Sequence, residues 1–170
     1  METITKIFNV YTFEELSKEA KERAINDFRE EPNLDFLPDK MHDKLEQLLE
    51  QHKIEGKGKV FYSLSYSQGD GAMFEGNFEW RGNSITIKQS GHYYHYNSKE
   101  ITFDDFECEE KEEKEELIAN EFNELYVEIC EELAQWGYDI IEFEDSEESI
   151  ADLCKINDYT FLDDGEMFNN

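Results

Sequence analysis

The negative charge of this 170-residue chain is concentrated in residues 104–170. This part holds 25 Asp and Glu residues but only three bases, Lys111, Lys114 and Lys155, so it carries −22 of the net charge of −27. Residues 1–103 hold 18 acids and 13 bases and are only mildly acidic. A charge of this sign repels nucleic acid and anionic lipid and attracts a basic partner. Any fold of residues 104–170 therefore has to hold its carboxylates away from the core.

A long helix over residues 109–136 meets this requirement. Its apolar residues recur every three or four positions, as expected of one buried helical side; they are Ile118, Phe122, Leu125, Ile129, Leu133 and Trp136. Gly137 follows directly and is typical of a helix C-cap. We expect the helix to end there.

The opposite side of this helix is acidic. Five glutamates step by three, four or eight positions away from the apolar side: Glu113, Glu116, Glu124, Glu128 and Glu131. Like charges at such spacing destabilise a helix by roughly 0.2–0.5 kcal/mol per pair, so an external use for them becomes plausible. Their span of 18 residues covers roughly 27 Å at about 1.5 Å per residue. A row of carboxylates of this length can imitate a nucleic-acid backbone, because the Lys and Arg groups that bind phosphates also bind carboxylates.

The end of the chain adds further acids. Residues 138–145 are predicted to form a strand or extended segment, and Asp145 with Glu148 resembles a capping box for a last helix over 146–158. If that helix packs beside the long one, five more carboxylates extend the acidic face: Glu142, Glu144, Asp145, Glu147 and Glu148. A short pair of strands around Asp164-Gly165 is expected at 159–168.

The first half of the chain has the pattern of an antiparallel sheet preceded by two helices. A strand is predicted at 3–13, a helix capped by Ser17 follows up to Glu31, and a second helix covers 38–54. After a turn at 55–59, four strands are expected at 60–66, 72–80, 84–89 and 93–103, joined by short links and therefore antiparallel. We predict one α+β domain over 1–170, a meander of about four to five strands with helices on one face. The pattern leaves open whether the aromatic face of the sheet is core or a dimer interface.

The glycine-rich stretch "SQGDGAMFEG" does not have the pattern of a phosphate loop. Such a loop needs a following helix, whereas a strand pattern follows here, and Asp70 and Glu75 would repel phosphate. We interpret it as a hairpin connection in which Gly69 and Gly71 take positive φ. His92 and His95, three residues apart on a predicted strand, would point to opposite faces, which makes them a poor metal pair.

No other pattern indicates an enzyme, a metal or a cofactor. Cys108, Cys130 and Cys154 form no C-x-x-C pair, so we expect reduced thiols in a cytoplasmic protein. No apolar run approaches membrane-spanning length, and the N-terminus lacks the pattern of a signal peptide.

Three stretches together resemble a group of small acidic proteins of bacteriophages and prophages in low-GC Gram-positive hosts. They are the opening "VYTFEELSKEAKERAINDFRE", the central "SQGDGAMFEG" with "HYYHYNS", and the closing "YTFLDDGEMF". The resemblance covers most of the chain and implies a phage accessory protein. Acidic proteins of that setting often inhibit host defence, including anti-CRISPR proteins that occupy the nucleic-acid path of an effector complex. The group brings no catalytic residue with it.

The leading hypothesis is a non-enzymatic inhibitor that acts in the cytoplasm of the host cell. Its acidic face would occupy the basic groove of a nucleic-acid-binding protein, a CRISPR effector nuclease or a restriction enzyme, without touching nucleic acid or membrane itself. Three alternatives stay open. One is an antitoxin-like module that caps a basic toxin, and another is a metal-dependent enzyme that uses Asp70, His92 or His95. The third is an acidic α+β domain whose charge serves solubility alone.

Overall fold

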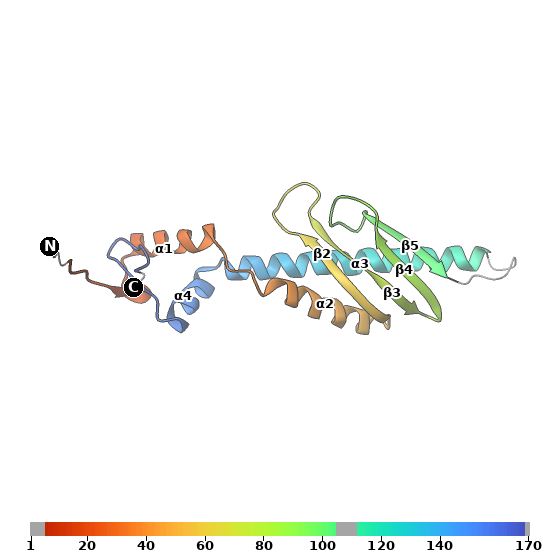
Figure 1. The fold of residues 1–170 in the computed structure, drawn as a ribbon, viewed down its shortest axis with the longest axis horizontal. Coiled ribbons are helices and arrows are strands. Elements are labelled where there is room, and N and C mark those ends of the chain that lie inside the picture. The colour runs from red at the N-terminus through yellow and green to blue at the C-terminus, as the bar shows by residue number, and fades with distance from the viewer. Residues whose placement is uncertain (1–5, 105–111, 169–170) are drawn as a thin grey trace, which may run out of the picture. The chain divides into compact units, whose positions relative to one another are not determined.

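The computed structural model describes the backbone of residues 6–104 and 112–168, and the side chains of 6–103 and 115–168 (Figure 1). It is an α+β structure, as predicted, with a long helix in the C-terminal half. The chain divides into two compact units. The sheet unit comprises Asp35–Asp139, and the terminal unit comprises the residues up to Leu34 together with those from Ile140 onward. The single-domain hypothesis stays a prediction.

The sheet unit contains the predicted antiparallel meander. Helix α2 (Leu37–Gln51) precedes strands β2 (Glu55–Ser63), β3 (Gly71–Trp80), β4 (Asn83–Gln89) and β5 (Lys99–Asp104). The strand order is β2-β3-β4-β5, and each neighbouring pair is antiparallel. Short links between sequential strands allow only this arrangement.

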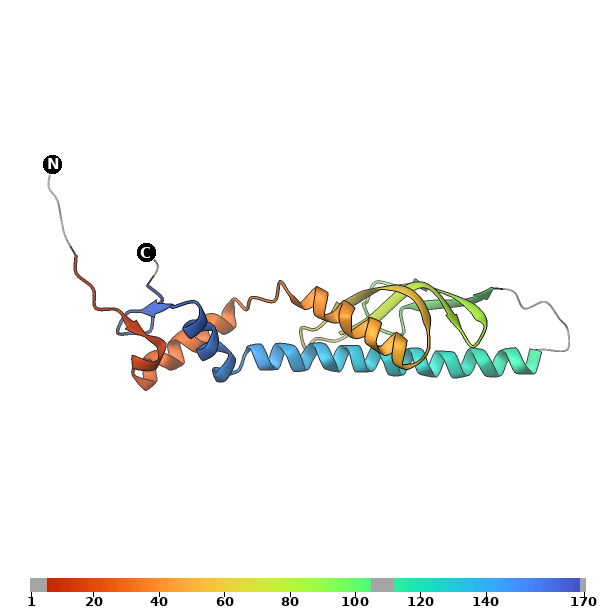
Figure 2. The ribbon, with the colours of Figure 1, turned by 90° about the horizontal axis from the view of Figure 1, so that it is seen from below.

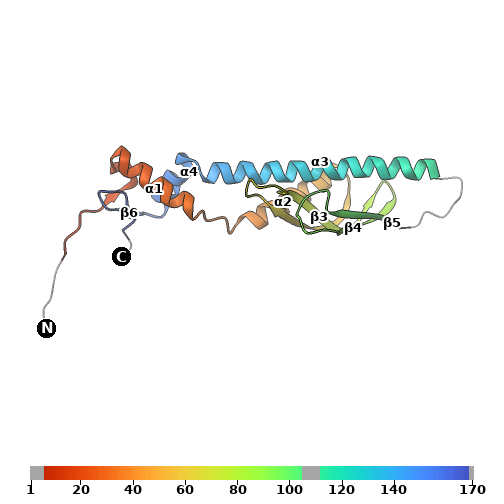
Figure 3. The same cartoon turned by 90° about the horizontal axis from the view of Figure 1, so that it is seen from above.

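The helices of the sheet unit cover one face of this sheet. Figures 2 and 3 show the sheet along one side of α3 (Glu112–Glu144). Phe74 of β3 packs on Tyr126 with ring centroids 4.7 Å apart, and Trp80 packs on Phe122 at 5.3 Å. Because side chains alternate along a strand, the residues at even positions of β3 share this face. Helix α2 adds Met41, Leu45, Leu48 and Leu49, all buried, to the core.

Tyr126 also completes the hydrogen bonding of β3. The β3–β4 ladder covers Gly76 to Trp80, so the backbone of Phe74 lies beyond it. The hydroxyl of Tyr126 donates to the Phe74 carbonyl oxygen at 3.1 Å and accepts from the Phe74 N–H at 3.4 Å. One buried side chain thus partners both backbone groups of a residue that β4 does not reach.

Helix α3 extends further at its C-terminal end than predicted, which corrects three expectations, and its predicted first residues, 109–111, lie outside the described part. It continues through Gly137 to Glu144, so Gly137 is not a C-cap and residues 138–145 are not a strand. Gly137 is buried, and a Cβ atom there would lie 2.4 Å from Cδ1 of Leu64 and 3.1 Å from Sδ of Met41. The glycine is therefore a point of close packing within the helix. Trp136, expected in the core, is 40% exposed.

Other boundaries differ as well. Residues 6–10 are outside regular structure, and only Tyr11–Thr12 (β1) of the predicted first strand forms a ladder; residues 3–5 lie outside the described part. The predicted turn at 55–59 is the first half of β2, where Gly58 lies under the Phe78 ring and the Leu45 side chain. Residues 93–98, predicted as strand, form a loop before β5.

The terminal unit combines the two ends of the chain. Strand β1 pairs with β6 (Thr160–Phe161), and a 3₁₀ turn η1 (Phe13–Glu15), α1 (Lys18–Glu30) and α4 (Glu147–Ile156) complete it. Its core consists of Phe13, Leu16, Ala20, Ala24, Ile25, Ile150, Cys154 and Phe161.

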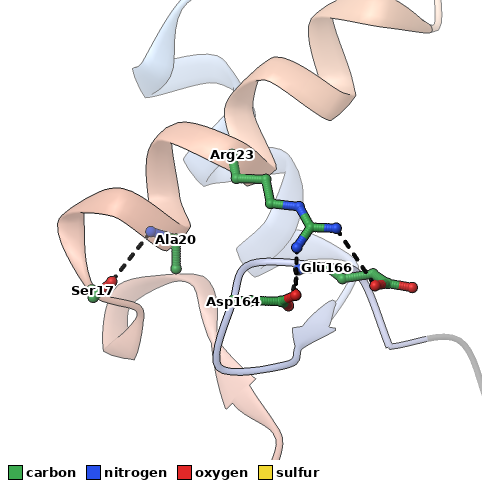
Figure 4. A network of polar contacts seen from close by, with 5 residues as sticks. All are labelled: Ser17, Ala20, Arg23, Asp164 and Glu166. Atoms are coloured by element: carbon green, nitrogen blue, oxygen red, sulfur yellow. Dashed lines mark hydrogen bonds and ion pairs between the residues drawn. The ribbon is translucent and has the colours of Figure 1, made fainter.

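Polar contacts support the two helices of this unit, and Figure 4 shows those of α1. Ser17 caps α1 as predicted, because its hydroxyl accepts from the Ala20 N–H at 3.2 Å. Arg23 of α1 forms ion pairs with Asp164 and Glu166 of the C-terminal turn. The cap of α4 is Ser146, whose hydroxyl accepts from the Ser149 N–H, and not the predicted Asp145.

Candidate functional site: the acidic face of α3 and the adjoining loops

The predicted acidic face lies along α3 in the sheet unit. Glu116, Glu124, Glu128 and Glu131 are exposed, and the side chain of Glu113 lies outside the described residues. At about 100° per residue, Glu124, Glu128 and Glu131 fall within an arc of about 60°, whereas Glu116 lies about 60° outside that arc. The opposite side of the helix holds the fully buried Phe122, Tyr126, Ile129 and Leu133. The structure therefore brings three glutamates, here called the outer triad (Glu124, Glu128 and Glu131), onto one solvent-facing side.

Two other glutamates of α3 are neutralised by cations of the sheet unit. Glu121 forms an ion pair with Arg81, and Glu132 accepts from Lys44 Nζ at 2.7 Å. The outer triad differs from this pair, because none of its members forms an ion pair with any described residue. Its charge is therefore available to a binding partner.

The five acids predicted to extend the face belong to the terminal unit. Glu142 is exposed near the end of α3, and Glu144 accepts from the Ser149 hydroxyl at 3.2 Å. The backbone carbonyl of Asp145 accepts from Arg29 Nε at 2.9 Å. Glu147 and Glu148 are exposed in the first turn of α4, where the helix dipole favours negative charge. Hydrogen bonds and the dipole of α4 thus explain the positions of several of these acids within the terminal unit. A continuous acidic face that joins them to the outer triad stays a prediction.

Asp70 organises the loop between β2 and β3, here called the serine loop (residues 64–70). Its carboxylate accepts hydrogen bonds from the backbone N–H groups of Ser65 and Ser67, at 2.6 and 2.8 Å, and from the Ser63 hydroxyl at 2.7 Å. The Ser67 N–H is the largest cause that holds the pKa of Asp70 far below its usual range, with the Ser63 hydroxyl acting in the same direction. Gly69 has φ +93° and Gly71 has φ +155°, and a strand follows, so the predicted turn is confirmed.

The serine loop meets the loop between β4 and β5, here called the tyrosine loop (residues 90–98). A Cβ atom at Gly69 would lie 2.8 Å from Cδ1 of Tyr93, and one at Gly71 would lie 2.9 Å from Cδ2 of His95. The rings of Phe61 and Tyr94 stack with centroids 5.5 Å apart. Two sequence motifs separated by a complete hairpin thus form one surface.

Two cavities open where these loops meet. One, of about 400 Å³, is lined by Gln68, Gly69, Tyr93, His95, Asn97 and Ser98. The other, of about 340 Å³, lies between both loops and α3 and includes Glu131 of the outer triad. The sequence analysis did not identify Tyr66, Tyr96, Gln135 or Tyr138 around these cavities. Tyr138 follows Glu131 by seven residues, two helical turns, so a prediction of the full length of α3 would have placed both on one side.

The described residues offer no arrangement for metal or thiol chemistry. Among them, no group of three His, Cys, Asp or Glu side chains could hold a metal ion. His92 and His95 both lie in the tyrosine loop and not on a strand. Burial raises the pKa of the Cys130 thiol to about 12 and that of Cys154 to about 11, so both thiols stay protonated at neutral pH. Cys108 lies outside the described residues.

Comparisons of the chain with protein families, with curated protein sequences and with solved structures find no match. No helix within the described part of the chain is both long and apolar enough to cross a membrane.

Proposed function

We propose that this chain is a non-enzymatic phage protein that inhibits a host defence enzyme acting on nucleic acid. Its outer triad would bind cationic side chains in the basic groove of that enzyme and exclude DNA or RNA. The first candidate for the target is a CRISPR effector nuclease, and the next is a restriction enzyme. The resemblance to phage accessory proteins supports a role in phage infection, and the concentrated negative charge supports binding to a basic groove.

The observation that carries this proposal is the contrast between two kinds of glutamate on one helix. Glu121 and Glu132 are paired with cations of the same unit, whereas Glu124, Glu128 and Glu131 are exposed and form no ion pair with a described residue. Like charges one helical turn apart cost about 0.2–0.5 kcal/mol per pair. A partner with Lys or Arg side chains at matching spacing would remove this repulsion and add charge-assisted hydrogen bonds.

The test is a pull-down from host lysate with the tagged protein, after nuclease treatment, at low and high salt. We expect it to retain a nucleic-acid enzyme that elutes at high salt and is displaced by its own DNA or RNA. Salt should act strongly, because the Debye length falls from about 8 Å at 0.15 M to about 3 Å at 1 M. A partner retained equally at both salt concentrations would contradict an electrostatic mechanism.

Two variants with equal change in charge assign the binding to a surface. The first reverses the outer triad (Glu124→Lys, Glu128→Lys and Glu131→Lys). The control reverses three exposed acids on α2 and β2 (Asp43→Lys, Glu50→Lys and Glu55→Lys). We expect the first variant to lose the partner and its inhibition, while the control keeps both. Equal behaviour of the two variants would show that net charge, and not this face, governs binding.

A second candidate function uses the same face. An antitoxin-like protein would cover a basic toxin instead of a nucleic-acid groove, and the outer triad would serve it equally well. The identity of the captured partner separates the two, since a toxin would not be displaced by a specific DNA or RNA substrate.

A further inference from the structure

The 340 Å³ cavity between the two loops and α3 has the size and lining of a binding site. It is lined by polar and aromatic side chains from three elements, chiefly Asp70, His95, Tyr96, Glu131, Gln135 and Tyr138. Ligand pockets of proteins span about 300–1,000 Å³, so this cavity lies at the small end of that range. It suits one side chain or a small ligand group better than a nucleotide.

Three of the side chains that line the cavity, His95, Tyr96 and Tyr138, carry aromatic rings. Tyr138 contacts Tyr66, with ring centroids 4.6 Å apart, and its hydroxyl donates to Asp70 Oδ2 at 3.4 Å. The His95 ring lies 3.9 Å from that of Tyr96, and its Nδ1 accepts from the Asn97 N–H at 3.2 Å. Tyrosine faces attract cations, most strongly where water is partly excluded.

The charges around the cavity also favour a cation. Backbone and hydroxyl donors, the Ser67 N–H first, stabilise the ionised Asp70 carboxylate and hold its pKa far below the usual range. Glu131 adds a second carboxylate that forms no ion pair with a described residue. A positive charge close to this region is Lys99, whose ammonium donates to the Tyr96 carbonyl at 3.0 Å and lies over the buried Tyr126 ring. Two carboxylates and no Lys or Arg are among the described residues that line the cavity, so an anionic ligand such as phosphate is disfavoured.

We propose that this cavity receives an arginine side chain of the basic partner. The inference rests on the proposed function, because Glu131 belongs both to the outer triad and to the cavity wall. A partner that covers the triad would therefore bring its cations to the cavity mouth. A guanidinium group is favoured over an ammonium, since it is planar, stacks on aromatic rings and binds a carboxylate with two parallel hydrogen bonds.

The test compares octa-arginine with octa-lysine, two peptides of equal charge, by isothermal titration calorimetry at low salt. Glu131→Gln removes one of the two carboxylates that line the cavity, and Glu128→Gln removes one carboxylate of the same triad that does not line it. We expect Glu128→Gln to weaken both peptides equally. Glu131→Gln should weaken octa-arginine about five-fold more than octa-lysine, which corresponds to about 1 kcal/mol.

A second pair of variants tests the cavity without changing charge. Ala134→Leu places a larger side chain on a cavity-lining position of α3, and Asn120→Leu places the same side chain on an exposed position outside the cavity. We expect only Ala134→Leu to remove the preference for octa-arginine. Far-ultraviolet circular dichroism verifies that each variant keeps its helix content.

The outcomes separate this inference from the proposed function. If both peptides bind and the four variants leave their affinity ratio unchanged, the arginine site is refuted while the acidic face stands. If neither peptide binds the unaltered protein at low salt, both proposals fall. A loss of arginine preference in Glu131→Gln and Ala134→Leu alone supports the cavity.

Discussion

The hydroxyl of Tyr126 provides a sharp test of how the sheet is held against α3. We predict that Tyr126→Phe destabilises the protein although it removes only one oxygen atom. The phenylalanine ring would keep the contact with Phe74, whose ring centroid lies 4.7 Å away. What it would lose is the partner of two buried backbone groups, the N–H and the carbonyl of Phe74.

The magnitude follows from these two hydrogen bonds. A buried polar group left without a partner costs about 1–3 kcal/mol. The bond to the carbonyl oxygen is 3.1 Å long and is lost in full, whereas the 3.4 Å bond from the N–H is long and contributes less. We therefore expect a loss of about 2–3 kcal/mol in the free energy of unfolding. That is a large part of the roughly 5–15 kcal/mol that stabilises a typical domain.

The assay is urea unfolding followed by tryptophan fluorescence, because Trp80 and Trp136 both lie in the sheet unit. With a slope of about 1–3 kcal/mol per molar urea, the midpoint should fall by roughly 1 M. The control is Tyr93→Phe, which removes a hydroxyl from a side chain that is 62% exposed and should change stability by less than about 0.5 kcal/mol.

The reasoning is refuted if Tyr126→Phe and Tyr93→Phe shift the midpoint equally. Amide hydrogen exchange gives a second readout at the residue concerned. The Phe74 amide should exchange faster in Tyr126→Phe and at the original rate in Tyr93→Phe. Unchanged protection of Phe74 would mean that its backbone does not depend on the Tyr126 hydroxyl.

Two further predictions concern local hydrogen bonds. The pKa of Asp70 is lowered in the folded state, so its stabilising contribution is present above the unfolded value of about 3.9 and is lost as the pH falls through the folded pKa. Asp70→Asn should therefore be less stable than the unaltered protein at pH 7, with a smaller difference at pH 2 in thermal unfolding; an equal difference at both pH values would contradict this. Ser17→Ala should lower the stability of the terminal unit by about 1 kcal/mol in thermal melts followed by circular dichroism, because α1 loses its cap. Ser17→Asp should retain most of that stability, and similar losses in both variants would exclude a capping role.

Elements specified by local signals could be predicted from the sequence. Helix α1 begins directly after its capping residue Ser17 and α2 has Pro38 in its first turn, and both have a clear apolar period. The strands β3 and β4 were placed to within a residue, because turn residues flank them on both sides. The spacings of four and three residues within the outer triad are also a local property of a helix, so its position opposite the core could be predicted.

The remaining features depend on contacts between distant parts of the chain. Gly137 has the local pattern of a C-cap, but its missing side chain makes room for Leu64 and Met41, and the helix continues. The glycine-rich serine loop and the aromatic run around Tyr93 each have the local pattern of a turn or a strand. Their meeting depends on the closure of the sheet, which no local pattern encodes. The cavity beside Glu131 could not be predicted for this reason.

The scarcity of bases in the C-terminal part determines which chemical probes can report on the face that α3 presents. No Lys or Arg lies between Lys114 and Lys155, so trypsin cannot cut this stretch whether it is folded, bound or free. A glutamate-specific protease, by contrast, has cleavage sites at the exposed residues of the outer triad. A partner that covers the triad would protect these sites from cleavage. Cross-linkers that join two amines will likewise not react with this stretch, because it contains no lysine. A carbodiimide, which couples a carboxylate to a neighbouring lysine without a spacer, would link the glutamates of α3 to the partner's lysines and mark both sides of the interface in one experiment.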